Sequence, residues 1–181
     1  MKSLAILLSI TACGLGLPLV AHAQSASMFQ PITGYGTIGY AGADNSGINL
    51  GAIQGRLGAR FGRYFGLEGE LAGGVKKDTV DVGGLPVEVK LEHQEAAYGV
   101  GYVPLTPRFD LFGRVGYGHS QIKASAAGVA QSGGEDSWNF GGGGQYFFTN
   151  NDGLRVDYTR HDFNNGGGNA DVWSVAYVRK F

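Results

Sequence analysis

The fold class can be read from a short stretch near the end of the chain, Leu154-Arg155-Val156-Asp157-Tyr158-Thr159. Apolar side chains occupy every second position, and polar side chains occupy the positions between them. Successive side chains of a β-strand point to opposite faces, whereas a helix repeats its apolar positions at a longer period. The stretch therefore predicts a strand with one apolar face and one polar face.

The same period of two continues on both sides of this stretch, from Ile32 to the end of the chain. The period of two is also clear at Phe65, Leu67 and Leu71, because Glu68 and Glu70 occupy polar positions between these apolar ones. We expect eight strands, at residues 32–42, 48–61, 65–75, 91–103, 109–123, 136–148, 153–162 and 171–181.

The connections between these strands alternate in length. Short turns are expected at residues 62–64, 104–108 and 149–152, and longer loops at 42–47, 76–90, 124–135 and 163–170. Bacterial outer-membrane barrels have short periplasmic turns and longer external loops. The pattern predicts an all-β fold, an eight-stranded antiparallel up-and-down transmembrane β-barrel with both termini in the periplasm.

The first 23 residues have the features of a secretory signal peptide. Lys2 supplies the positive charge, residues 4–20 are apolar, and Ala21-His22-Ala23 is a small-x-small cleavage site. We expect a signal peptide at 1–23 and one outer-membrane barrel domain at 24–181. The alternative is a lipoprotein signal ending at Cys13, because residues 10–13 resemble a lipobox, but cleavage there would leave a very short apolar segment.

Composition excludes several classes of protein. The 181 residues include 14 Lys and Arg against 15 Asp and Glu, without a basic block, so we expect no nucleic-acid partner. Cys13 is the only cysteine, so the mature chain has no disulfide and no thiol chemistry. After residue 23 no apolar run reaches the roughly 20 residues of a spanning helix, so a membrane location requires a closed barrel.

Lysine and aromatic positions indicate that the apolar face meets lipid. The five mature lysines all lie in expected loops or at strand ends, whereas a soluble barrel would carry lysine along its solvent face. Two aromatic girdles are expected, as at membrane interfaces. One comprises Phe61, Phe65, Tyr102, Phe109, Phe148 and Phe181 near the short turns, and the other Tyr40, Tyr117, Trp138 and Trp173 near the loops. A soluble ligand-binding barrel is the alternative.

Charged residues concentrate on the polar parity of the strands, which should face the lumen. They are Arg56, Arg60, Glu68, Glu70, Glu95, Asp110, Arg114, Arg155 and Asp157, together with Gln145 and Asn139. An eight-stranded barrel has room for side chains but not for a channel, and charges buried there must be paired. The sequence therefore favours a salt-bridged plug, and an ion pathway is the alternative.

Strand alternation also predicts specific neighbours within this set. A turn centred on Arg63 places Arg56 opposite Glu70 and Arg60 diagonal to Glu68. The same counting along the other hairpins places Gln145 opposite Arg155 and Glu95 near Arg114.

Motifs that suggest a catalytic or cofactor site are weak in this chain. Residues 34–39 match the dinucleotide pattern G-x-G-x-x-G, but they lie within a strand pattern that no helix follows. No two of His93, His119 and His161 have a metal-ligand spacing. The neighbours His119 and Ser120 would point to opposite faces of a strand. We therefore expect no metal, no cofactor and no enzyme, with a lipid A-modifying barrel enzyme as the alternative.

Several stretches resemble the transmembrane domain of the OmpA-like and OmpX-like barrel family. They are residues 50–58 with 64–70 (second hairpin), 111–117 (fifth strand), 154–158 (seventh strand) and 175–181 (last strand). The resemblance covers the mature chain and implies the barrel fold but no peptidoglycan-binding domain. It also implies that Tyr177 and Phe181 form the signal read by the barrel assembly machinery, although Arg179 departs from that pattern.

The resemblance implies a porin-like cell-envelope protein of a Gram-negative outer membrane. Its expected partners are outer-membrane lipid, lipopolysaccharide and the barrel assembly machinery, and we expect a monomer. Arg160 lies on the lipid-facing parity and could meet lipopolysaccharide phosphates. We expect a structural or surface-interaction role, with a small pore or transporter as the main alternative.

Overall fold

The computed structural model describes residues 31–181 apart from 46–47, 83–84, 127–128, 165 and 167, so the expected signal peptide lies outside the described residues. These residues form nine strands: β1 (Ile32–Asn45), β2 (Ile48–Phe61), β3 (Phe65–Lys76), β4 (Asp78–Val82), β5 (Leu85–Pro104), β6 (Phe109–Ala126), β7 (Val129–Phe147), β8 (Asp152–Phe163) and β9 (Asn169–Lys180). Among them, no helix is long and apolar enough to cross a membrane.

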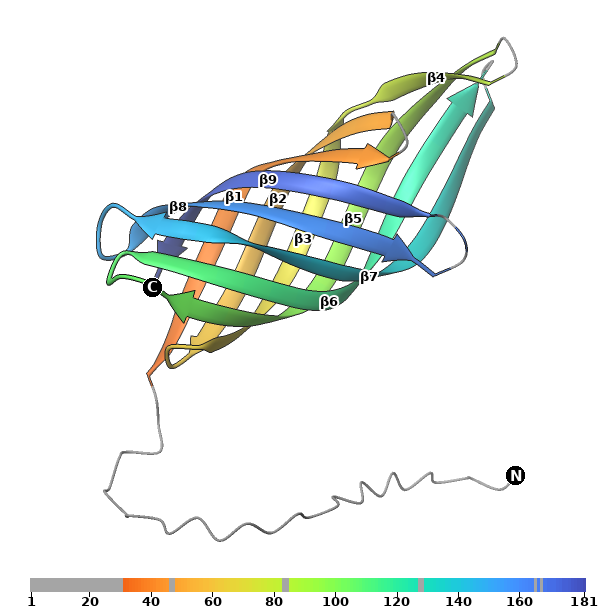
Figure 1. Ribbon diagram of the computed structural model, residues 1–181. Coiled ribbons are helices and arrows are strands. Elements are labelled where there is room, and N and C mark those ends of the chain that lie inside the picture. Colours follow the sequence, from red (N-terminus) through yellow and green to blue (C-terminus); the bar gives the residue numbers. More distant parts are fainter. Residues whose placement is uncertain (1–30, 46–47, 83–84, 127–128, 165, 167) are drawn as a thin grey trace, which may run out of the picture.

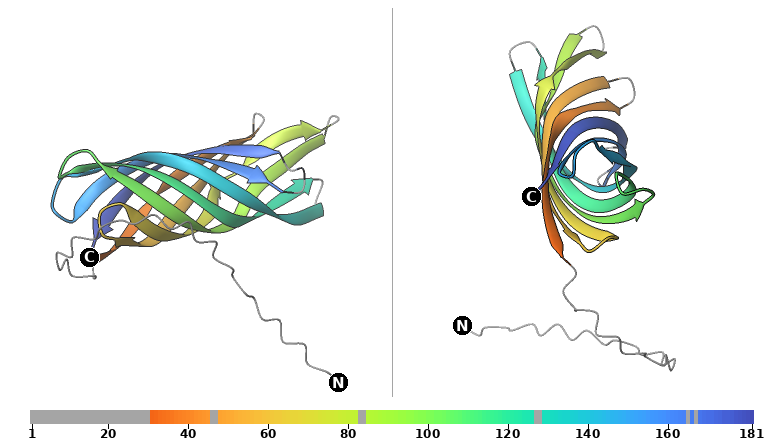
Figure 2. Two further views of the ribbon diagram at one scale, coloured as in Figure 1. Left: turned by 60° about the horizontal axis from the view of Figure 1, so that its bottom comes forward. Right: turned by 90° about the vertical axis from the view of Figure 1, so that its left-hand side faces the viewer.

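The strands form one closed antiparallel barrel. The sheet order is β3-β2-β1-β9-β8-β7-β6-β5-β4, and an additional pairing between β3 and β5 closes the wall. Eight strands form the barrel, and the short β4 extends one end of it (Figures 1 and 2). The predicted eight-stranded antiparallel barrel is confirmed.

The two ends of the barrel differ. At one end, which we call the short-turn end, β2 passes to β3 through three residues, and Phe61 pairs with Phe65 across the turn. Gly62 adopts φ +66° there, a left-handed conformation that favours glycine. The barrel also starts and finishes at this end: Ile32 pairs with Phe61, and the backbone N–H of Phe181 donates to the carbonyl of Gly34.

At the opposite end, two expected long loops are strands instead. Residues 78–82 pair with 85–89 in a hairpin, and β6 and β7 continue their pairing up to Ala126 and Val129. Alternating valines at 80, 82, 87 and 89 explain the first of these hairpins, because β-branched residues favour strands. The expectation of irregular loops at 76–90 and 124–135 was wrong.

These hairpins form a four-stranded extension that we call the projecting sheet, which comprises residues 78–82, 85–91, 120–126 and 129–136 (Figure 1). β4 is the last strand of the sheet order. The pairing of β7 with β8 begins only at Ser137 with Phe163. Both outer strands of the projecting sheet therefore end the sheet instead of continuing it around the barrel.

The outer wall of the barrel is apolar, as predicted. Leu111, Val115, Leu154 and Val156 are all exposed on the outside. The lumen also has an apolar layer near the short-turn end, formed by Tyr35, Tyr98, Val100, Tyr102, Phe112, Phe147 and Val178. Tyr102 therefore faces the lumen, and its predicted place in the aromatic girdle near the short turns was wrong.

Candidate functional site

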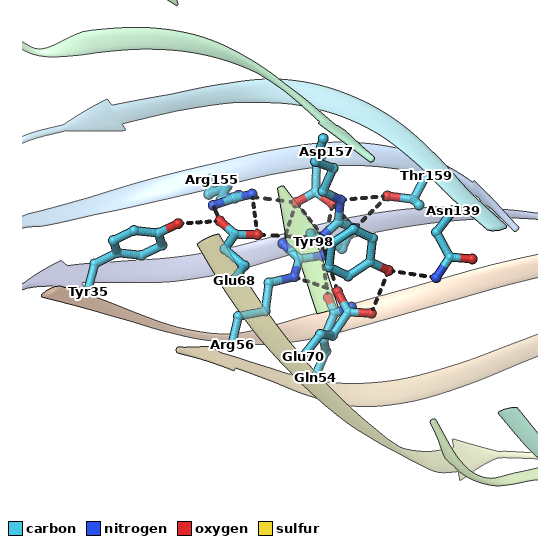
Figure 3. A network of polar contacts seen from close by, with 12 residues as sticks. Tyr35, Gln54, Arg56, Glu68, Glu70, Tyr98, Asn139, Arg155, Asp157 and Thr159 are labelled. Carbon is cyan, nitrogen blue, oxygen red and sulfur yellow. Dashed lines mark hydrogen bonds and ion pairs between the residues drawn. The ribbon is translucent and has the colours of Figure 1, made fainter. Parts of the chain in front are cut away.

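The middle of the lumen holds six charged side chains, which we call the lumen network: Arg56, Glu68, Glu70, Arg114, Arg155 and Asp157. Figure 3 labels all of them except Arg114. They come from β2, β3, β6 and β8 and are almost completely buried. Three guanidinium groups face three carboxylates, so the formal charges cancel.

Arg56 joins two carboxylates from opposite sides of the lumen. Its Nε atom donates to Oε2 of Glu70 at 2.7 Å, on the neighbouring strand. Its Nη1 and Nη2 atoms donate to the two carboxylate oxygens of Asp157 at 2.8 and 2.9 Å, across the barrel on β8. Such two-pronged charged hydrogen bonds fix both partners in one geometry.

Arg114 closes a ring with the same two carboxylates. It donates to Oε2 of Glu70 at 3.0 Å and to Oδ1 of Asp157 at 3.1 Å, and its guanidinium also donates to the hydroxyl of Thr159. Its guanidinium carbon lies 4.4 Å from the centre of the Tyr98 ring. Both carboxylates therefore accept hydrogen bonds from two arginines each, and Asp157 also lies 3.6 Å from Nε of Arg155.

Arg155 forms the part of the network nearest the short turns. Its Nη1 and Nη2 atoms donate to the carboxylate of Glu68 at 2.5 and 3.2 Å. The hydroxyl of Tyr35 also donates to Glu68, at 2.7 Å, and lies 2.6 Å from the hydroxyl of Tyr102. The guanidinium stacks 3.8 Å from the ring centre of Phe112, which joins the charged layer to the apolar layer beneath it.

A second ion pair lies closer to the short turns. Arg60 donates to Oδ2 of Asp110 at 2.8 Å, and Gln145 donates to the same oxygen at 3.0 Å. Asp110 therefore accepts from two side chains on the short-turn side of the lumen network. All but one of the nine predicted lumen charges thus lie in the lumen.

The predicted neighbours are correct in register but only partly correct in contact. Arg56 lies opposite Glu70 and binds it. Arg60 lies diagonal to Glu68, yet it binds Asp110 instead. Gln145 lies opposite Arg155, but it too binds Asp110.

Glu95 is the exception. It is exposed on the outer face of β5, where it pairs with His119 and not with Arg114. The lumen-facing positions of β5 are those of Tyr98, Val100 and Tyr102, so the apolar parity of this strand faces inward. The lumen assignment of Glu95 was wrong because an apolar layer inside the barrel reverses the usual relation between hydropathy and face.

Six further residues complete the hydrogen bonding of the network, and the sequence analysis did not single them out: Tyr35, Gln54, Gln94, Tyr98, Thr159 and Ser174. All are uncharged, so a search for paired charges passed over them. Two of them could have been predicted from strand alternation. Gln54 lies two residues from Arg56 and Thr159 lies two residues from Asp157, so each faces the lumen with its charged neighbour.

Glycines make room for the rings in this narrow lumen. A Cβ atom added to Gly58 would lie 2.3 Å from the Tyr35 ring, and one added to Gly116 would lie 2.5 Å from the Tyr98 ring. Any larger side chain at either position would displace the tyrosine whose hydroxyl serves the network.

The arrangement offers little catalytic chemistry. Within the described ranges, no group of three or more His, Asp or Glu side chains is placed to hold a metal ion. His119 points outward and pairs with Asp136 at 2.7 Å, whereas Ser120 is buried in the lumen. The residues 34–39 of the dinucleotide-like pattern lie inside β1 and precede further strand, not a helix.

The family model of the outer membrane protein beta-barrel domain matches residues 6–181. The chain belongs to this family. A search of curated proteins found no match.

Solved outer-membrane barrels share the fold. The attachment invasion locus protein Ail of Yersinia pestis, solved with the heparin analogue sucrose octasulfate, is 19% identical with a TM-score of 0.61, over 83% of this chain and 99% of Ail. The N-terminal barrel of Pseudomonas aeruginosa OprF is 14% identical with a TM-score of 0.59, over 84% of this chain and 98% of that chain. Neisserial surface protein A is 13% identical with a TM-score of 0.55, over 83% of this chain and 97% of that chain.

This outer-membrane barrel carries its remaining predicted residues on the outer wall. Tyr177 and Phe181 are exposed near the short-turn end. Arg160 is exposed toward the opposite end, with Nη1 3.4 Å from a carboxylate oxygen of Asp171. Arg179 lies beside Asp152, at 3.4 Å, at the short-turn end.

Proposed function

We propose that this barrel is a surface-interaction protein whose lumen is a salt-bridged plug and whose projecting sheet contacts partners outside the cell. In this proposal the short-turn end and both termini face the periplasm, because periplasmic turns of such barrels are short. The observation that carries the proposal is the free outer edge of β7 over residues 129–135, which pair with β6 only among the residues that the structure describes.

An unpaired strand edge presents a row of backbone N–H and C=O groups to which another extended chain can pair. Proteins usually protect such edges with charged side chains, lysine above all, or with proline. Residues 129–134 contain no charged residue and no proline, and they include the small residues Ser132, Gly133 and Gly134. This supports an extended polypeptide as the partner.

Charge does not favour a polyanion at this end. The structure of Ail holds sucrose octasulfate, a sulfated heparin analogue. Here the hairpin segments 76–92 and 119–136 contain four lysines and six acidic residues. A sulfated glycan would meet more repulsion than attraction, so the partner is a polypeptide and not a polyanion.

The plug is supported by the burial and pairing of the lumen network. Each network carboxylate accepts from at least one arginine, and the six side chains cross the lumen from β2 and β3 to β6 and β8. Moving an ion past them would require breaking buried ion pairs, which costs several kcal/mol or more.

Adhesion of cells that display the protein tests this role. We expect cells expressing the wild type to bind immobilised extracellular proteins or epithelial cells more than cells without it. Replacing Ala130 and Ser132 by proline should remove most of this binding, because their backbone N–H groups face away from β6, on the same side as the Asp136 carbonyl that accepts from Asn164, and proline blocks strand pairing there. The Lys77→Ala/Glu88→Ala variant, which breaks an exposed ion pair in the other hairpin, is the matched control. Equal adhesion by the proline variant would contradict the proposal.

We also propose that Tyr177 and Phe181 form the assembly signal implied by the family resemblance. Phe181 is 74% exposed and follows the last strand residue, so it is accessible to another protein before the barrel closes. Deleting Phe181 should lower the outer-membrane yield in cells and leave refolding into detergent near normal. Equal defects in both assays would mean that Phe181 acts only in packing.

Arg160 is proposed to contact lipopolysaccharide phosphate, a partner suited to guanidinium. Its only ion pair among the described residues is the exposed one with Asp171. Arg160→Ala should weaken binding of lipopolysaccharide to the refolded barrel, whereas Arg179→Ala at the other end should not. Unchanged binding in Arg160→Ala would exclude this contact.

A further inference from the structure

A cavity of about 70 Å³ lies inside the barrel between the lumen network and the projecting sheet. Lumen-facing residues of seven strands line it. A single water molecule needs only about 10–15 Å³ of such space. The cavity therefore has room for a small molecule and not only for one water.

The walls of the cavity are apolar and its floor is polar. Leu50, Leu91, Ile122, Phe163 and Val172 are the large side chains of the wall, and alanines fill the positions between them. The floor is formed by Gln54, Gln94, Ser120 and His161. A molecule that fits this cavity has an aliphatic part and one polar end.

Two of the four floor side chains, Gln54 and Gln94, are held by hydrogen bonds, and the other two, His161 and Ser120, have unused hydrogen-bonding capacity. Gln54 accepts from Arg56 at 2.9 Å and Gln94 donates to Glu70 at 2.9 Å, so both are held by the lumen network. His161 is 2% exposed and Ser120 is 4% exposed, and neither side chain has a hydrogen-bond partner among the described residues. Both side chains line the cavity, and buried polar groups normally have a partner, so a polar group of a bound molecule can supply one.

The floor favours an uncharged polar end. Directly beneath it, three guanidinium groups are matched by three carboxylates, so no net charge remains to attract an ion. A carboxylate or ammonium group would lose its hydration without a counter-ion. An alcohol or amide can donate to one floor group and accept from the other.

The wall continues upward as an apolar strip. Leu91 and Ile122 pair across β5 and β6 and both line the cavity. Because side chains alternate along a strand, Val89, Val87 and Leu85 extend from Leu91 on the same face of the projecting sheet. An aliphatic chain that rises from the cavity would therefore meet apolar surface beyond its mouth.

We propose that this cavity binds a single-chain aliphatic molecule with an uncharged hydrogen-bonding head. The head lies at His161 and Ser120, and the chain follows the wall toward the projecting sheet. This site differs from the edge of β7 that carries the proposed function, so either can fail without the other.

Nuclear magnetic resonance of the histidine rings tests the site, with 1-hexanol as the probe. The refolded barrel in lipid nanodiscs, labelled with ¹⁵N at histidine, contains His161 in the cavity and His93 and His119 on the outer face. Hexanol should shift the His161 ring signals along a saturating curve, while His93 and His119 report only its partitioning into lipid. Sodium hexanoate should bind at least about tenfold more weakly, a difference of about 1.4 kcal/mol.

Two matched variants separate binding in the cavity from effects on lipid. Ala72→Leu fills the cavity and should abolish the saturating shift, whereas Ala97→Leu adds the same volume on the exposed outer face and should not. A His161 shift that is absent, linear, or unchanged in Ala72→Leu would overturn the proposal, and the cavity would then hold water only. Heat-modifiability on gels identifies any variant that does not fold.

Discussion

The lumen network and the projecting sheet share only strand β6, and their ion pairs have different surroundings. The Arg56 and Glu70 side chains are both 0% exposed, whereas those of Glu88 in the projecting sheet and of Lys77, which directly precedes the sheet, are 42% and 60% exposed. Buried charges lose their hydration and depend on their partners, while exposed charges can exchange partner for water. How much an ion pair contributes to stability therefore depends more on its position in the barrel than on its being an ion pair.

Backbone pairing shows the same contrast. In the wall every strand has two neighbours, so the barrel has no edge there. In the projecting sheet β7 loses β8 as a neighbour above Ser137. Closure suits a membrane, where unpaired backbone groups are very costly, and an open edge is tolerated where water can solvate it. The wall is thus suited to stability and the projecting sheet to contact.

The largest predicted effect separates these two regions directly. Glu70→Ala leaves Arg56 and Arg114 with one carboxylate fewer, and it should lower the free energy of unfolding by about 3–5 kcal/mol. Glu88→Ala, the matched change in the projecting sheet, should cost about 1 kcal/mol or less. Urea titration in detergent measures both.

A double variant checks the cause. Arg56→Ala/Glu70→Ala leaves two arginines and two carboxylates in the network, so it should recover part of the stability lost in Glu70→Ala. Equal stability of wild type and Glu70→Ala, or a double variant that is the sum of its singles, would contradict the pairing account.

The outer wall should show the next largest effect. Val156 is half exposed on the lipid-facing side of β8, and an arginine there should cost about 2–4 kcal/mol near the bilayer midplane. Ser132→Arg in the projecting sheet should change stability little. Cysteines at the same two positions sharpen the test, because only the one at 132 should react with water-soluble maleimide in intact cells. Reaction at 156 would contradict the lipid-facing assignment.

A smaller effect is expected at the border between charged and apolar layers. Tyr35→Phe removes the hydroxyl that donates to Glu68 at 2.7 Å, while Arg155 continues to bind that carboxylate. The loss should be about 1 kcal/mol, as for a single hydrogen bond. Tyr40→Phe on the outer wall is the control. A Tyr35→Phe barrel as stable as the control would show that Arg155 alone satisfies Glu68.

The smallest predicted effect lies at the base of the projecting sheet. Backbone N–H groups of Asn49 and Thr79 donate to the Asp78 carboxylate and lower its pKa below the ordinary value. A carboxyl group with a lowered pKa contributes at neutral pH and loses its contribution as pH falls through the folded-state pKa. Acidification should therefore lower the protection factors of the Asn49 and Thr79 amides, the ratio of intrinsic to observed exchange rate, in the wild type. In Asp78→Ala these protection factors should be low at every pH, and a pH-dependent difference that persists there would assign it to another group.

The period of two and the turn at Arg63 were sufficient to predict the barrel and one of its central contacts. Local counting places Arg56 opposite Glu70 because the turn is short and its register is fixed. The same counting cannot place Arg155 against Glu68, because β8 and β3 are not neighbours in the wall and meet only across the lumen. Contacts across a barrel depend on its curvature and closure, which a single hairpin does not encode.

The errors have physical causes as well. Glu95 and Tyr102 were assigned to the wrong faces because β5 carries its apolar residues inward and small residues such as Gly99 and Gly101 outward. Residues 78–82 and 85–89 pair as a hairpin instead of forming the expected loop, because alternating valines at 80, 82, 87 and 89 favour strands on both sides of the glycines at 83 and 84. The polar floor at Ser120 and His161 was missed because a strand position alone does not show whether a cavity lies before it.

Single-channel recording in planar lipid bilayers tests most directly the claim that the lumen is closed. The refolded wild-type barrel should give a flat current trace under an applied voltage, because the lumen network and the apolar layer together fill the interior. Arg56→Ala/Glu70→Ala, which removes two of the six charged side chains, serves as the comparison and should show any current that the network suppresses. Reproducible conductance steps in the wild type would contradict the account and favour a small pore.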